Sequence, residues 1–143
     1  MNLEYKTPKK REYVHGCPSK HDAPIITVNV GKWSVWTISQ HLRRMAGLEA
    51  GHKAFVARDK DTGAWYIGFS RAGDGNTLTY TGGKYGLVFR NKETAKELLA
   101  GATFARYLVM PKPQEQDGIS WYKILTDNPL YSDSNRHSYD KQD

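Results

Sequence analysis

The sequence predicts an α+β fold that is mainly β, with two β-β-α-β-β repeats sharing one barrel or sandwich. The chain has 143 residues, of which 38% are hydrophobic and 25% are charged, and these values suit one compact domain. A segment that begins at residue 26 matches a second segment 52 positions later. Each of these segments is followed by a short helical pattern and then by a further hairpin pattern.

The first two strands of each repeat align without a gap, residues 26–36 over residues 78–88. The aligned positions share a threonine, a glycine and a lysine, and their apolar positions face apolar partners. β-Branched and aromatic residues flank the dipeptides at 30–31 and 82–83, which contain the glycine that a tight hairpin turn needs. Each copy therefore predicts a strand, a turn and a strand.

A short amphipathic helix follows each hairpin. Ser39 and Asn91 stand 52 positions apart, and both are good N-caps because a short side-chain oxygen accepts a free first-turn N–H. Helical spacing of apolar residues follows each cap, and Gly47 and Gly101 mark the expected helix ends. The apolar positions are Leu42, Met45 and Ala46 in the first copy, and Ala95, Leu98, Leu99 and Ala102 in the second.

A second hairpin closes each repeat. The first copy predicts strands at 53–59 and 64–70 around a turn at 60–63. The second copy predicts strands at 105–110 and 119–126 around a longer proline-containing loop. Trp121-Tyr122 in this copy corresponds to Trp65-Tyr66 in the first. The glycine-rich segment 71–76 lacks the Gly-Lys-Ser/Thr ending of a phosphate loop, so it is interpreted as a linker.

These elements divide the chain into three parts. Residues 1–24 form a polar, basic N-terminal arm, and residues 127–143 form an acidic, polar C-terminal tail, which we expect to be flexible or to attach another protein. Residues 25–126 form the duplicated domain, with repeat one at 25–71 and repeat two at 77–126. One repeat is too small to bury a core, so the two must interlock.

Alternation along the first hairpins predicts which side chains supply this core. We also expect the four tryptophans to pack in the core or against the hairpins, because aromatic residues in strands usually pack. The predicted inward residues are Ile26, Val28, Val30, Trp33, Val35, Leu78, Tyr80, Tyr85 and Leu87, and the tryptophans are Trp33, Trp36, Trp65 and Trp121.

The stretch 38–59 contains Leu42-Arg43-Arg44, then Gly47-Leu48, then Gly51-His52 before a closing hairpin. It resembles the swapped-hairpin DNA-binding domains of the AbrB, SpoVT and MazE type, over about residues 26–70 and more faintly over 78–126. In that family two chains exchange hairpins to form one dimer. The resemblance therefore implies a swapped-hairpin-like, fused pseudo-dimer within this single chain.

The sequence also departs from the family pattern. Ser39 stands in place of a proline, His52 in place of an acidic residue, and Val35 in place of a basic residue. The second copy has Lys-Glu-Leu-Leu at 96–99, where the first has Leu-Arg-Arg-Met. These departures concern the binding surface more than the fold.

The net charge of +6 lies mostly in the two repeats and favours an anionic partner. The resemblance implies that Arg43 and Arg44 contact DNA, because a guanidinium binds phosphate or guanine through two N–H donors. Lys32 and Lys84 occupy equivalent hairpin sites. Four further cations extend the predicted face: Lys53, Arg58, Arg90 and Lys92. The alternative interpretation is a solvated surface with ordinary helix charges.

No catalytic or cofactor site is predicted. His15, Cys17 and His21 lack the fourth ligand of a zinc site, and the carboxylates form no acid/base pair. No membrane-spanning stretch or secretory signal is found, so a cytoplasmic location is expected. A lone cysteine forms no internal disulfide.

The leading hypothesis is thus a non-enzymatic transcriptional regulator that binds duplex DNA, as a pseudo-symmetric monomer or as a homodimer. Two alternatives stay open. One is a structural or assembly protein, for example a virion-associated one, and the other is an antitoxin-like protein that binds a partner through its N- or C-terminal tail.

Overall fold

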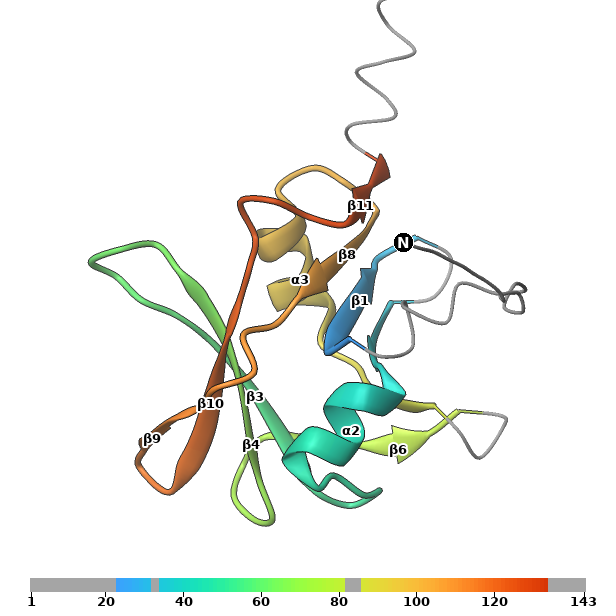
Figure 1. The fold of residues 1–143 in the computed structure, drawn as a ribbon. Helices are drawn as coiled ribbons and strands as arrows, with labels where there is room; N and C mark the ends of the chain where they lie inside the picture. The colour runs from blue at the N-terminus through green and yellow to red at the C-terminus, as the bar shows by residue number, and fades with distance from the viewer. Residues whose placement is uncertain (1–22, 32–33, 82–85, 134–143) are drawn as a thin grey trace, which may run out of the picture.

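The computed structural model describes residues 23–31, 34–81 and 86–133, and Figure 1 shows how their elements are arranged. The described residues form two antiparallel sheets and two helices, so the predicted α+β, mainly β class is confirmed. Among these residues no helix is both long and apolar enough to cross a membrane.

The first sheet has six strands in the order β11-β8-β1-β2-β7-β6. Its strands are β1 (Ile25–Asn29), β2 (Val35–Ile38), β6 (Thr79–Tyr80), β7 (Leu87–Phe89), β8 (Phe104–Leu108) and β11 (Tyr131–Ser132). The second sheet has five strands in the order β5-β3-β4-β10-β9. They are β3 (Lys53–Arg58), β4 (Trp65–Ser70), β5 (Asn76–Thr77), β9 (Gln114–Gln116) and β10 (Ile119–Ile124).

Helices α2 (Gln40–Ala46) and α3 (Lys92–Leu99) have the predicted N-caps. Ser39 accepts a hydrogen bond from the Leu42 amide, and Asn91 accepts one from the Thr94 amide. Helix α2 ends as predicted at Gly47, whose φ of 66° is left-handed. Helix α3 reaches this conformation one residue before Gly101, at Ala100 with φ 49°. The helices lie apart, with α2 in the lower half and α3 in the upper half of Figure 1.

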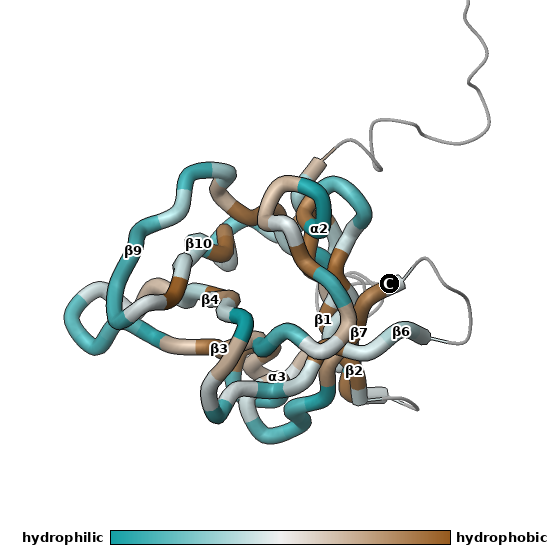
Figure 2. The backbone as a smooth tube through the Cα atoms, turned by 90° about the horizontal axis from the view of Figure 1, so that it is seen from below, coloured by the Kyte–Doolittle hydropathy of each residue, from teal (hydrophilic) through white to brown (hydrophobic). Residues whose placement is uncertain are grey.

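The core lies between the two sheets, where hydrophobic stretches of both are seen from below in Figure 2. Trp36 and Phe89, which face each other on β2 and β7, are fully buried and stacked with ring centroids 5.2 Å apart. The alternation predicted for the first hairpins is only partly confirmed. Val35 is half-buried while its neighbour Trp36 is buried, and Tyr80 is 45% exposed.

Strands from the two halves of the chain pair with each other four times. In the first sheet β1 pairs with β8, and β2 pairs with β7. In the second sheet β3 pairs with β5, and β4 pairs with β10. Neither half therefore forms a sheet of its own, and the core belongs to both.

The second predicted hairpin of the second copy differs from the first. Strands β3 and β4 pair over six positions around their turn, as predicted. Strand β8 instead pairs with β1 and β11, and the chain after it meets β10 only around the bridge between Val109 and Ile124. Strand β10 forms its hairpin with β9, which the sequence patterns did not predict. The long loop thus supplies an extra edge strand.

The predicted equivalence of Trp65-Tyr66 with Trp121-Tyr122 is wrong. Trp65 lies opposite Ile124 and is buried, whereas Trp121 lies opposite Gly68 and is half-buried. Side chains alternate along a strand, and directly paired residues share a face. The two tryptophans consequently point to opposite faces of the second sheet.

The expectation of core tryptophans is therefore confirmed for Trp36 and Trp65 but not for Trp121. Trp33, Tyr85 and residues 1–22 of the basic arm at 1–24 lie outside the described residues. The start of the C-terminal tail is attached to the domain, because Tyr131 and Ser132 form β11. The linker at 71–76 is a run of bends that leads into β5.

Candidate nucleic-acid interface

Arg43 is held in place between α2 and β6. Its Nε donates to the Leu48 carbonyl at 3.3 Å, and an Nη donates to the Tyr80 hydroxyl at 3.0 Å. The guanidinium also lies 5.2 Å from the centroid of the Tyr80 ring. A guanidinium has five N–H donors, and these two contacts use two of them. Arg43 thus has a structural role and retains donors for a ligand.

Lys53 contacts the same segment of the chain as Arg43, residues 76–80. Its Nζ donates to the Thr77 hydroxyl at 2.7 Å. The backbone of this segment is fixed as well, because the Gly51 amide donates to the Leu78 carbonyl at 2.8 Å. Arg43 and Lys53 thus both contact the segment 76–80, through Tyr80 and Thr77 respectively.

Arg44 is the exposed neighbour of Arg43 in the last turn of α2. Its side chain is exposed, whereas that of Arg43 is half-buried. A cation near a helix C-terminus is favoured by the negative end of the helix dipole. Arg44 is therefore the member of the arginine pair that is free of the fold's own packing.

Arg58 lies far from Lys53, at the other end of β3. A strand of six residues spans roughly 17 Å between its ends. The Arg58 Nε donates to the Gly63 carbonyl at 3.4 Å, and its guanidinium lies 5.8 Å from the Trp65 ring centroid. The structure therefore places Arg58 away from Lys53, at the other end of β3.

Arg90 and Lys92 lie at the start of α3, and both are exposed. Because Phe89 pairs with Trp36, the start of α3 is beside the start of β2. The start of α2 is, conversely, beside the start of β7. These two cations are thus at the opposite end of the β2–β7 pair from the start of α2.

Lys32 and Lys84 lie outside the described residues, so the structure places neither of them. Sequence reasoning missed Lys96, which is exposed in the last turn of α3. Lys96 follows Arg44 by 52 positions, the same offset as between the two N-caps. That offset is the signal that identifies it.

The described part of the chain holds no group of three or more histidine, cysteine, aspartate or glutamate side chains able to bind a metal. His15, Cys17 and His21, which lack the fourth ligand of a zinc site, are outside this part.

A scan of protein-family models and searches of curated proteins and of solved structures found no match. The arguments on function therefore rest on this chain's own residues.

Proposed function

We propose that this chain is a small DNA-binding protein and transcriptional regulator, in which two swapped-hairpin-like repeats present cations to duplex DNA. The observation that carries the proposal is the pair Arg44 and Lys96. Both are exposed in the last turn of a helix, and Figure 1 shows the helix of Arg44 in the lower half and that of Lys96 in the upper half of the molecule. A pseudo-two-fold protein meets a roughly symmetric duplex with such paired groups.

The strands at the centre of the first sheet, β2 and β7, are the two that the offset of 52 positions relates, and they pair antiparallel. Trp36 pairs with Phe89, and Thr37 pairs with Val88. An offset of 52 positions converts the first pair into the second, because it carries Trp36 to Val88 and Thr37 to Phe89. Every antiparallel pair has this property, so it is the adjacency of β2 and β7, and not their register, that agrees with a two-fold axis between the copies.

The second hairpins support an offset of 55 positions. Lys53 pairs with Ser70 in the first copy, and 55 positions later the Leu125 amide donates to the Leu108 carbonyl at 2.9 Å.

The pairings that link the halves obey both offsets together. Lys53 pairs with Thr77 in the second sheet, and Leu108 pairs with Ile25 in the first. The offset of 55 relates Lys53 to Leu108, and the offset of 52 relates Ile25 to Thr77. One departure is found in the β6–β7 pair, which is displaced by one residue after Leu78. Exchange of hairpins between two repeats accounts for these registers.

Charge supports DNA as the ligand of this arrangement. The chain has 21 lysines and arginines against 15 acidic residues. Lysine contacts phosphates as a point charge, whereas arginine binds phosphate or guanine through two donors. Arg43 extends the surface around Arg44, while its contacts with Leu48 and Tyr80 fix the end of α2.

An assembly protein is the second candidate, and one observation favours it. Leu130 and Tyr131 are 51% and 39% exposed, and both lie at the edge strand β11. An exposed edge strand with apolar side chains is able to pair with another chain. In that case the barrel is a scaffold and the protein partner adds to β11.

The test is fluorescence anisotropy with a pool of mixed-sequence duplex DNA at several salt concentrations. For about six neutralised phosphates, log affinity falls against log salt with a slope of about −5. The double variant Arg44→Ala/Lys96→Ala is expected to reduce the magnitude of that slope by about 2, since each lost phosphate contact removes about 1.

The control is Lys60→Ala/Lys112→Ala, which removes the same charge from two other exposed positions. It is expected to retain most of the affinity and the slope. Equal losses in the two double variants would show that net charge alone attracts DNA. Absence of binding at low salt would refute the DNA-binding proposal and leave the assembly protein.

A further inference from the structure

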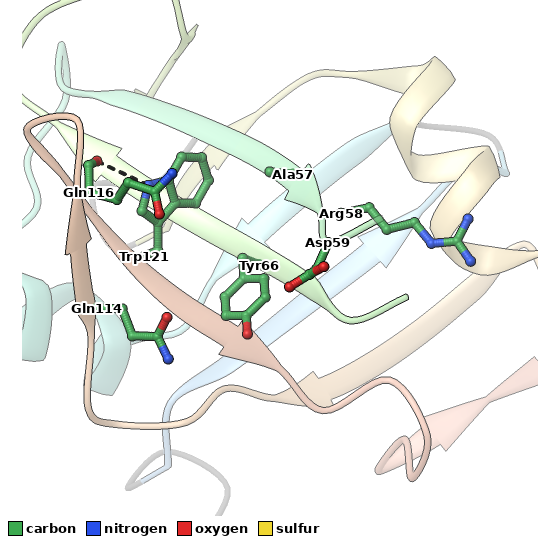
Figure 3. A pocket seen from close by; sticks show the side chains of 7 residues that line it. All are labelled: Ala57, Arg58, Asp59, Tyr66, Gln114, Gln116 and Trp121. Carbon is green, nitrogen blue, oxygen red and sulfur yellow. Dashed lines mark hydrogen bonds between the residues drawn. The ribbon is translucent and has the colours of Figure 1, made fainter. Parts of the chain in front are cut away.

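A pocket of about 260 Å³ lies on the outer face of the second sheet, outside the core. Figure 3 shows its side chains, which come from the end of β3, from β4 and from the β9–β10 hairpin. The side chains that matter here are Arg58, Asp59, Tyr66, Gln114, Gln116 and Trp121. A pocket of this volume suits a single small ring rather than a drug-sized ligand.

The Trp121 indole is fixed as one wall of the pocket. Its Nε1 donates to the Gln116 carbonyl at 3.2 Å (Figure 3). A Cβ atom at Gly68 would lie 2.7 Å from an indole carbon, so the glycine lets the ring lie close against β4. Phe55 supports the ring from the neighbouring strand, with centroids 6.4 Å apart. A rigid, half-buried ring loses little entropy when a ligand stacks on it.

Polar groups that both donate and accept hydrogen bonds surround this ring. Gln114 and Gln116 carry amides, and Tyr66 carries a hydroxyl. Asp59 accepts hydrogen bonds from the amides of Asp61 and Thr62 through Oδ1. Its second carboxylate oxygen therefore has lone pairs to offer to a ligand.

The charge of the pocket disfavours an anion. The one cationic side chain that lines it, Arg58, points away from the other lining side chains in Figure 3. Its guanidinium is engaged by the Gly63 carbonyl and the Trp65 ring. The Asp59 carboxylate repels phosphate at short range. The ligand that fits is neutral, has an apolar face for the indole, and has several hydroxyl groups.

We propose that this pocket binds one neutral sugar ring of a saccharide, stacked on Trp121 and hydrogen-bonded by Asp59, Gln114 and Gln116. The polarised C–H groups on one face of a sugar ring are attracted to the negative face of an indole. The hydroxyl groups at its edge match amides and a carboxylate. The proposal does not depend on DNA binding, since neither Arg44 nor Lys96 lines the pocket.

The test follows the indole N–H signal of Trp121 by two-dimensional NMR, assigned with the variant Trp121→Phe. The probes are the methyl glycosides of glucose, galactose, mannose and N-acetylglucosamine, with uridine and uridine monophosphate as comparison ligands. A ligand of this size in an open pocket is expected to bind with a Kd of about 1 mM. At least one glycoside should shift the signal saturably.

The variants separate the parts of the site. Trp121→Ala lacks the indole signal, so its binding is followed by saturation-transfer NMR on the glycoside, and binding should be abolished. Gln114→Ala should weaken binding about fivefold by removing a hydrogen bond. Gln114 is exposed at the edge strand, so its removal leaves the fold intact. Lys112→Ala, an exposed change outside the pocket lining, is the control and should leave the Kd unchanged.

The variant Asp59→Asn is expected to change the affinities for the sugar and for uridine monophosphate in opposite directions. Asparagine retains the Oδ1 acceptor of the turn and removes the charge, so sugar binding should weaken about fivefold. Binding of uridine monophosphate would instead become tighter, because a repulsive charge is lost. Failure of every glycoside to shift the Trp121 signal, or tighter binding of a glycoside in Asp59→Asn, would overturn the proposal.

Discussion

The two faces of the second sheet both carry aromatic rings, but they differ in what covers them. On the inner face Trp65 and Tyr122 are 8% and 5% exposed and belong to the core. On the outer face Phe55, Tyr66 and Trp121 are half-buried and therefore partly open to solvent. The same residue types thus serve stability on one face and remain accessible to ligands on the other.

Gly68 illustrates how one strand supplies core residues to the inner face and leaves space on the outer face. Gly68 lies between Ile67, which is fully buried on the inner face, and Phe69, which packs 6.0 Å from Tyr122. On the outer face the missing side chain at Gly68 leaves room for Ile119 and Trp121. Alternation along one strand therefore separates core packing from the shape of the outer surface.

The largest expected effect comes from placing one substitution on each face. Trp65→Ala should lower the free energy of unfolding by about 3–5 kcal/mol, because it opens a cavity in the core. Trp121→Ala should lower it by less than about 2 kcal/mol, since its ring is already partly solvated. Urea unfolding followed by circular dichroism measures both. Equal losses would contradict the distinction between the faces.

Gly68→Ala tests the outer face alone and should have a smaller effect. Its new methyl group would lie 2.5 Å from an Ile119 methyl carbon, so the side chains above it must shift. We expect a loss of about 1–3 kcal/mol in the free energy of unfolding. In the Trp121→Ala background the same change should cost less, because one of the obstructing side chains is gone. An unchanged cost in that double variant would place the strain elsewhere.

The sequence was sufficient for the local elements. Ser39, Asn91 and Gly47 could be predicted because caps and helix ends depend on short-range hydrogen bonds and on the freedom of glycine. Strands β3 and β4 were predictable because a short turn joins two strongly patterned segments. These features depend on neighbours in the chain.

Long-range pairings and side-chain faces were harder to predict. A shift of one residue reverses the face of a strand residue, and the equivalence of Trp65 with Trp121 failed for that reason. Strand β9 has only polar residues, Gln114–Gln116, so no apolar alternation marked it. The pocket beside Trp121 depends on this strand and was therefore not predicted.

The smallest expected effect distinguishes an inner tyrosine from an exposed one at alkaline pH. Burial, and secondly the negative charge of Glu115, raise the pKa of Tyr122 above its ordinary value. Burial likewise raises the pKa of Tyr107 in the first sheet. A raised pKa in the folded state means that the native protein keeps a proton that the unfolded chain loses. The stabilisation is complete below about pH 10 and is lost as the pH rises through the folded pKa.

Urea unfolding at pH 8 and at pH 10.5 measures this loss, which is at most about 1.4 kcal/mol per pH unit for each tyrosine. Tyr122→Phe should make the alkaline loss smaller, because one of the linked protons is removed. Tyr131→Phe is the matched control, since Tyr131 is exposed on β11, and it should behave as the wild type. An equal alkaline loss in wild type and in Tyr122→Phe would mean that Tyr122 is solvated, and the inner face would then not be sealed around it.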